Sequence, residues 1–240
     1  MDRQVAFRVF RFDPQSDSEP RFDTFTVEAR EGMNVLEGLF YILENLDGSL
    51  AFRFSCRGAV CGSCAMFING AYRLACKTML RDLKEVTISP LGHLPVIKDL
   101  VVDMRPFYRK YESILPYLLP ASEPPLKEYP QSPKQRHAIN EMIDCILCGC
   151  CHAACPIVWT NKDYLGPAAL TKAYRFVADS RDGAENERLA LVSGPDGIWR
   201  CHTIFNCHEV CPKYINPTYS IQQLKRMAIS RRLHFWRKNK

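Results

Sequence analysis

The stretch C-I-L-C-G-C-C-H-A-A-C-P, residues 145–156, places five cysteines within twelve positions. Four of them, with the proline that follows, have the spacing C-x2-C-x2-C-x3-C-P. This is the spacing with which thiolates bind a [4Fe-4S] cluster, and in proteins with two clusters the fourth cysteine of the run binds the other cluster. A second run of cysteines is therefore expected elsewhere in the chain. The ligands in the first run would be Cys145, Cys148, Cys151 and Cys155.

The second run is C-H-T-I-F-N-C-H-E-V-C-P, residues 201–212, and it lacks one cysteine because Ile204 stands at the second position. Exchanging the fourth ligands between the runs gives one cluster four thiolates and the other cluster three. We predict that the second cluster is [3Fe-4S], since the apolar side chain of Ile204 cannot bind a fourth iron. The predicted ligands are Cys145, Cys148, Cys151 and Cys211 for the [4Fe-4S] cluster, and Cys155, Cys201 and Cys207 for the [3Fe-4S] cluster.

A third group of cysteines lies in F-S-C-R-G-A-V-C-G-S-C-A, residues 54–65. Its C-x4-C-x2-C spacing is the opening of a plant-type [2Fe-2S] site. Gly58 and Gly62 allow the loop to turn sharply and to point backbone N–H groups at sulfur. A zinc site would more usually have two C-x2-C pairs. The predicted [2Fe-2S] ligands are Cys56, Cys61, Cys64 and Cys76.

Two further residues near the cysteine runs need an interpretation. Cys150 does not fit the spacing of the first run, and we expect it to be a small buried side chain. His202 follows a predicted ligand, and its imidazole would titrate near neutral pH beside a redox centre. It is therefore the histidine for which we expect a functional role.

Hydrophobic patterning predicts two domains of different classes. Alternating strands at 5–12 and 22–29, a helix capped by Asn34 and a tight hairpin at Asn69-Gly70 indicate a small α+β domain over residues 1–105. Seven prolines between 106 and 133 predict a linker. Helical patterns then predict an all-α domain over 134–240, with the cysteines in its loops. The predicted helices are 137–146, 167–178, 185–191 and 217–233.

Composition limits the classes of protein that fit. The chain has 240 residues, 47% hydrophobic and 24% charged, which is enough for two globular cores. No apolar stretch is long enough to span a membrane, and the N-terminus does not have the pattern of a signal peptide. We therefore expect a cytoplasmic, prokaryotic protein whose cysteines are reduced or bound to metal. No phosphate loop or dinucleotide motif is present, so the chain should pass electrons between partners that perform the chemistry.

The end of the chain is basic, with eight basic side chains and no acidic one from Lys213 onward. A zinc protein that binds nucleic acid is the alternative from another functional class. Basic residues alternate with aromatic residues only at 234–238, which gives that alternative little support. We expect no nucleic-acid partner.

The chain resembles the iron-sulfur subunits of succinate dehydrogenase and quinol:fumarate reductase. The resemblance implies a β-grasp [2Fe-2S] domain followed by a helical ferredoxin domain, an α+β architecture with the cluster ligands given above. Related iron-sulfur subunits of other flavoenzymes are the alternative. Besides the two cysteine runs, the resemblance extends over S-C-R-G-A-V-C-G-S-C (55–64), L-P-V-I-K-D-L-V-V-D-M (94–104), Y-L-G-P-A-A-L (164–170) and R-F-V-A-D-S-R-D (175–182).

The resemblance also implies partners. An FAD-containing flavoprotein subunit would interconvert succinate and fumarate, and one or two membrane-anchor cytochrome b subunits with haem b would hold the complex at the cytoplasmic face of the inner membrane. Electrons would pass between flavin and quinone through the three clusters, in either direction. Pro156, His202 and Ile204 match residue types that lie near the quinone. Thr160 stands where ubiquinone-using members often have a second tryptophan after Trp159. A menaquinone-linked form, with the quinone held mainly by a cytochrome subunit, therefore fits equally well, and the quinone would be menaquinone or ubiquinone.

Overall fold

The computed structural model describes residues 3–81, 83–123 and 125–238, the last five of these by their backbone alone. The basic and aromatic side chains noted above at 234–238 are not among the described side chains. The chain forms two compact units, and it passes from one to the other three times. The first unit contains Met1–Arg105 and Ile146–Ala154, and the second contains Pro106–Cys145 and Cys155–Lys240.

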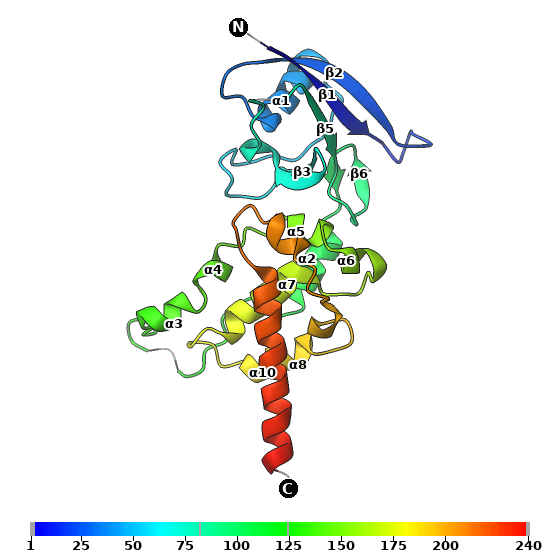
Figure 1. The fold of residues 1–240 in the computed structure, drawn as a ribbon. Helices are drawn as coiled ribbons and strands as arrows, with labels where there is room; N and C mark the ends of the chain where they lie inside the picture. The colour runs from blue at the N-terminus through cyan, green and yellow to red at the C-terminus, as the bar shows by residue number, and fades with distance from the viewer. Residues whose placement is uncertain (1–2, 82, 124, 239–240) are drawn as a thin grey trace. The chain divides into compact units, whose positions relative to one another are not determined.

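The first unit is built on a mixed five-stranded sheet with the order β2-β1-β5-β3-β4 (Figure 1). Strand β1 pairs antiparallel with β2 and parallel with β5, while β3 pairs antiparallel with β5 and β4. A small second sheet contains β6 and β7, which the sequence patterns did not predict. The strands are β1 (Arg3–Arg11), β2 (Arg21–Ala29), β3 (Ala65–Ile68), β4 (Ala71–Leu74), β5 (Glu85–Ser89), β6 (Val96–Lys98) and β7 (Val101–Val102).

Helix α1 (Val35–Asn45) packs its apolar face into the core of this unit. Asn34 caps it as predicted, because the Asn34 side chain accepts from the backbone N–H of Glu37 and the Glu37 carboxylate accepts from the N–H of Asn34. Gly38 faces the buried ring of Phe7 at a distance that leaves no room for a Cβ atom. The predicted hairpin is also present, with positive φ at Asn69 (46°) and Gly70 (82°).

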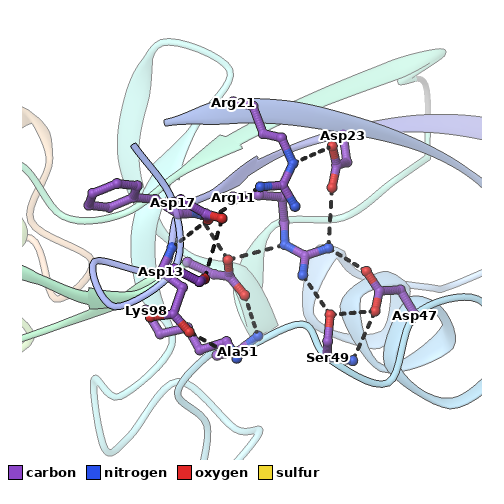
Figure 2. A network of polar contacts seen from close by, with 12 residues as sticks. Arg11, Asp13, Asp17, Arg21, Asp23, Asp47, Ser49, Ala51 and Lys98 are labelled. Carbon is purple, nitrogen blue, oxygen red and sulfur yellow. Dashed lines mark hydrogen bonds and ion pairs between the residues drawn. The ribbon is translucent and has the colours of Figure 1, made fainter. Parts of the chain in front are cut away.

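A buried arginine joins the ends of several elements of the first unit (Figure 2). The Arg11 guanidinium donates to Asp99 Oδ1 at 3.1 Å and to Ser49 Oγ at 2.8 Å, and it also pairs with Asp47 and Asp23. The Arg11 and Asp99 side chains are only 5% and 3% exposed. The other Asp99 oxygen accepts from the N–H of Ala51, the residue that opens the loop leading to Cys56. The network therefore fixes the start of that loop.

The second unit is helical, and its core lies where α7 packs against α8 and α10. Leu170, Leu189, Ile221 and Leu224 are almost completely buried there. Among the described residues, no helix combines the length and apolar character needed to cross a membrane. The helices are α2 (Arg105–Glu112), α3 (Pro133–His137), α4 (Asn140–Ile143), α6 (Pro156–Thr160), α7 (Gly166–Val177), α8 (Glu185–Val192), α9 (Asn206–Glu209) and α10 (Pro217–Lys238); α5 (Cys150–Ala153) belongs to the first unit.

Two features of this unit differ from the sequence patterns. Of the helix predicted over 137–146, only α4 (Asn140–Ile143) is present, and α3 (Pro133–His137) ends where the predicted helix begins. The proline-rich segment expected as a linker is attached to the unit. Ile114 is fully buried, and the buried Arg188 side chain donates to the carbonyls of Ile114, Leu115 and Tyr117.

Candidate metal centres

The loop before β3 surrounds the sulfur of Cys56 with backbone N–H groups. Gly58, Val60 and Cys61 donate to Cys56 Sγ at 3.3–3.4 Å, and the N–H of Cys56 donates to Cys61 Sγ at 3.4 Å. Three positive φ angles in the loop turn these groups inward, as in other backbone sites that bind anions or iron-sulfur clusters. The positive values are at Arg57 (55°), Ala59 (57°) and Gly62 (75°).

The other two predicted [2Fe-2S] ligands lie beside this loop. Cys64 is buried, burial raises the pKa of its thiol to about 12, and the neighbouring Cys76 thiol contributes to the shift. The backbone of Ala75 donates to the carbonyl of Cys64 at 2.9 Å, which fastens the 3-10 turn Ala75–Lys77 next to it. At Cys61, burial opposes ionisation, but hydrogen bonds from Ser63 and Cys56 outweigh burial and lower the pKa to about 6. The donors and thiols present therefore fit a thiolate-bound cluster.

Three cysteines of the second unit line one small pocket. Cys155 precedes α6, Cys201 follows a 3-10 turn (Ile198–Arg200), and Cys207 is in α9. Burial raises the pKa of both Cys155 and Cys207, and each thiol also feels the charge of Cys201. This donor set fits a cluster with three protein ligands. The pocket is also lined by the predicted quinone-proximal residues Pro156, His202 and Ile204.

Helix α10 holds the loop that carries Cys201 and Ile204. Lys225 Nζ donates to the carbonyl of Cys201 at 2.9 Å, and Gln222 Nε2 donates to Thr203 Oγ1 at 2.9 Å. Thr218 Oγ1 lies 3.4 Å from Cys207 Sγ. The sequence patterns did not single out these three residues. Their spacing of four and then three positions places them on one face of a helix, and this polar stripe was the available signal.

The four predicted [4Fe-4S] ligands are divided between the units, so their joining in one cluster stays a prediction. Cys148 and Cys151 belong to the first unit, and Cys145 and Cys211 to the second. Cys150 is fully buried, and its thiol hydrogen-bonds to Cys148 and lowers the pKa of Cys148. In the described part of the chain, no three Cys, His, Asp or Glu side chains are arranged to hold a single metal ion.

The cysteine-containing segment Ile146–Ala154 packs closely on the loop of the first site. A Cβ atom on Gly62 would lie 2.8 Å from Cys148 Cβ, 2.9 Å from Cys148 Cα and 3.0 Å from the Ile146 carbonyl oxygen. Since Gly62 also has a positive φ, no other residue type fits this position without strain.

Comparisons with known proteins agree with these two kinds of site. Residues 6–109 match the family described as 2Fe-2S iron-sulfur cluster binding domain, and residues 141–215 match the 4Fe-4S dicluster domain. The succinate dehydrogenase iron-sulfur subunit of Paracoccus denitrificans is 44% identical over 228 residues, which are 94% of this chain and 88% of that protein. The chain belongs to the succinate dehydrogenase iron-sulfur subunit family.

Solved structures support the same fold for this family member. A chain of the Mycobacterium smegmatis Sdh1 complex in the apo form matches with a TM-score of 0.88 and 27% identity, covering 96% of this chain and 98% of that chain. A hypothetical protein from Helicobacter pylori matches with a TM-score of 0.56 and 18% identity, covering 94% of this chain and 40% of that one, which is a likeness of fold alone.

The family and the fold class predicted from the sequence are therefore confirmed, as are a [2Fe-2S] and a [4Fe-4S] domain. The comparisons do not favour another flavoenzyme or a zinc protein that binds nucleic acid. The individual ligands, the [3Fe-4S] centre and the quinone-proximal residues stay predictions. The Thr160 hydroxyl donates to carbonyls of its own helix.

Proposed function

We propose that the chain relays single electrons between the FAD of a flavoprotein subunit and quinone at a membrane-anchor cytochrome b subunit with haem b. The relay would run through [2Fe-2S], [4Fe-4S] and [3Fe-4S] clusters. The observation that carries this proposal is the pocket in which Cys155, Cys201 and Cys207 gather with Ile204 and without a fourth cysteine. A site with three thiolates at one end of the relay can pass electrons to the final acceptor. The site itself needs no substrate chemistry for this.

The clusters would supply one-electron oxidation and reduction at potentials set by cluster type, charge and hydrogen bonding to sulfur. The residues around the cysteines position the thiolates and set the charge and the hydrogen bonding around each cluster. At the first site, backbone N–H groups donate to Cys56 Sγ and stabilise negative charge on sulfur. This loop is at the surface of its unit, where Cys56 is exposed and Val60 is 63% exposed, so a partner's redox group can approach it closely.

The other end of the relay would meet quinone. Pro156, His202 and Ile204 line the pocket that holds the three cysteines, which supports their assignment as quinone-proximal residues. Thr160 is not part of that lining. The quinone would be menaquinone or ubiquinone. Helix α10 has exposed basic residues at Arg226, Arg231 and Arg232. Their charges would favour binding of the subunit to anionic lipid at the cytoplasmic face of a prokaryotic inner membrane.

Electron paramagnetic resonance of the purified complex at low temperature tests this function. The oxidised sample should show a three-iron signal, and reduction should add the [2Fe-2S] and [4Fe-4S] signals. Iron analysis should account for three clusters per chain. An oxidised sample with full iron content and no three-iron signal would overturn the proposed end of the relay, and a zinc-containing sample would overturn the whole function.

Replacing Ile204 by cysteine should supply the missing fourth thiolate. Because Ile204 lines the pocket with the three cysteines, we expect most of the three-iron signal to be replaced by that of a second [4Fe-4S] cluster. Ile204→Val is the matched control, since it changes the side chain without adding a ligand and should keep the three-iron signal. An unchanged three-iron spectrum in Ile204→Cys would show that residue 204 does not reach the vacant corner of the cluster.

A further inference from the structure

Lys172 extends from α7 toward the segment that leads into the [4Fe-4S] run. Its side chain is half-buried, and Nζ donates to the backbone carbonyl of Met142 at 3.3 Å. Met142 is in α4, the short helix that packs on α7 and ends two residues before Cys145. The lysine therefore places a cation against the segment that leads to the first predicted ligand of the [4Fe-4S] cluster.

The charges around Lys172 agree with this placement. Burial lowers the pKa of Lys172, and the negative charges of Cys145 and Asp144 act in the opposite direction, the Cys145 charge more strongly. Arg175, one helical turn further along α7, adds a positive charge that acts in the same direction as burial. The ammonium group is thus within electrostatic reach of the thiol that would bind iron.

The two cations of this face of α7 differ in what neutralises them. Arg175 is paired with Asp179 at 3.2 Å, and Asp179 is fully buried. Among the ion pairs of the described residues, none includes Lys172. No carboxylate in contact with Lys172 therefore cancels its positive charge. That charge acts on the cluster that Cys145 would bind.

We infer that Lys172 raises the reduction potential of the [4Fe-4S] cluster by placing a cation near the segment that carries Cys145. The reduced cluster carries one more negative charge than the oxidised cluster, so a fixed cation stabilises the reduced form more. Lys172 is a positioning residue in this sense, because it acts through the field at the cluster and touches no substrate. The inference rests on the proposed function, in which Cys145 is a ligand of the middle relay.

A redox titration of the complex, followed by the electron paramagnetic resonance signal of the reduced [4Fe-4S] cluster, measures this effect. Lys172→Gln and Lys172→Met, which keeps the aliphatic stem, should each lower the equilibrium constant for reduction about tenfold, or 59 mV for one electron. Lys172→Arg keeps the charge and should restore most of the parent potential. The [2Fe-2S] and [3Fe-4S] signals should shift much less.

Two further variants separate charge from structure. Lys162→Gln removes an exposed lysine of the same unit and should leave the potential unchanged. Asp144→Asn removes the negative charge of the residue that precedes Cys145 and should raise the potential, opposite to the Lys172 variants. Parent-like potentials in Lys172→Gln and Lys172→Met, with the four-iron signal intact, would overturn the inference alone. A parent complex without any four-iron signal would overturn the proposed function.

Discussion

Arg11→Met is expected to lower the free energy of unfolding of the first unit by about 3–5 kcal/mol, because it leaves a buried carboxylate without its cation. The Asp99 side chain is 3% exposed, and Arg11 Nε is its partner at 3.1 Å. A loss of this size is a large part of the roughly 5–15 kcal/mol by which a domain is stable. Denaturant unfolding of the full chain, followed by far-ultraviolet circular dichroism and by the visible absorbance of the [2Fe-2S] cluster, measures it.

Arg21→Met is the matched control for this variant. Arg21 also pairs with Asp17 and Asp23 near the end of the same hairpin, but its side chain is 51% exposed, so its loss should cost about 1 kcal/mol or less. Adding Asp99→Asn to Arg11→Met removes the unpaired charge and should recover part of the stability. An Arg11→Met protein as stable as the Arg21→Met protein would show that the buried network does not hold the unit together.

Gly62→Ala should prevent the first cluster loop and the segment Ile146–Ala154 from packing together. The added Cβ would meet backbone and Cβ atoms of Cys148 at 2.8–2.9 Å, and these cannot rotate away as a flexible side chain would. The positive φ of 75° adds roughly 1–2 kcal/mol of backbone strain, and overpacking adds about 1–3 kcal/mol. We expect most of the [2Fe-2S] signal to disappear from the purified protein.

Gly70→Ala separates the strain from the clash. Gly70 has nearly the same backbone conformation, with φ of 82°, but nothing lies within 4 Å of the position of a Cβ atom. It should cost only the backbone strain and keep its cluster. If Gly62→Ala and Gly70→Ala retained the [2Fe-2S] signal equally, close packing against Cys148 would not be needed for the site.

The elements that could be predicted from the sequence are those whose signals are local. Asn34 with Glu37 forms a capping box, Asn69-Gly70 supplies the positive φ angles of a tight turn, and both occur where expected. Cysteine spacing predicted the [2Fe-2S] and [4Fe-4S] domains for the same reason, since ligands in one cluster loop must be near one another in the chain. The grouping of Cys155, Cys201 and Cys207 needed one further rule, the exchange of fourth ligands between two runs.

The features that could not be predicted depend on contacts between distant residues. Arg188 binds the carbonyls of residues 114–117, more than seventy positions earlier, and no local pattern in the proline-rich segment indicates this partner. Asp99 and Arg11 are 88 positions apart and would each be read singly as ordinary surface charges. Lys172 likewise gave no signal, because its role depends on where α4 packs.

The membership of Ile146–Ala154 in the first unit has a consequence for synthesis of the protein. Translation proceeds from the N-terminus at about 5–20 residues per second, and domains usually fold as they emerge. Here the N-terminal unit lacks part of its own packing until residue 154 has left the ribosome. A nascent chain that ends at residue 105 would expose the surface around Gly62, so iron insertion into the first loop should wait for the middle of the polypeptide.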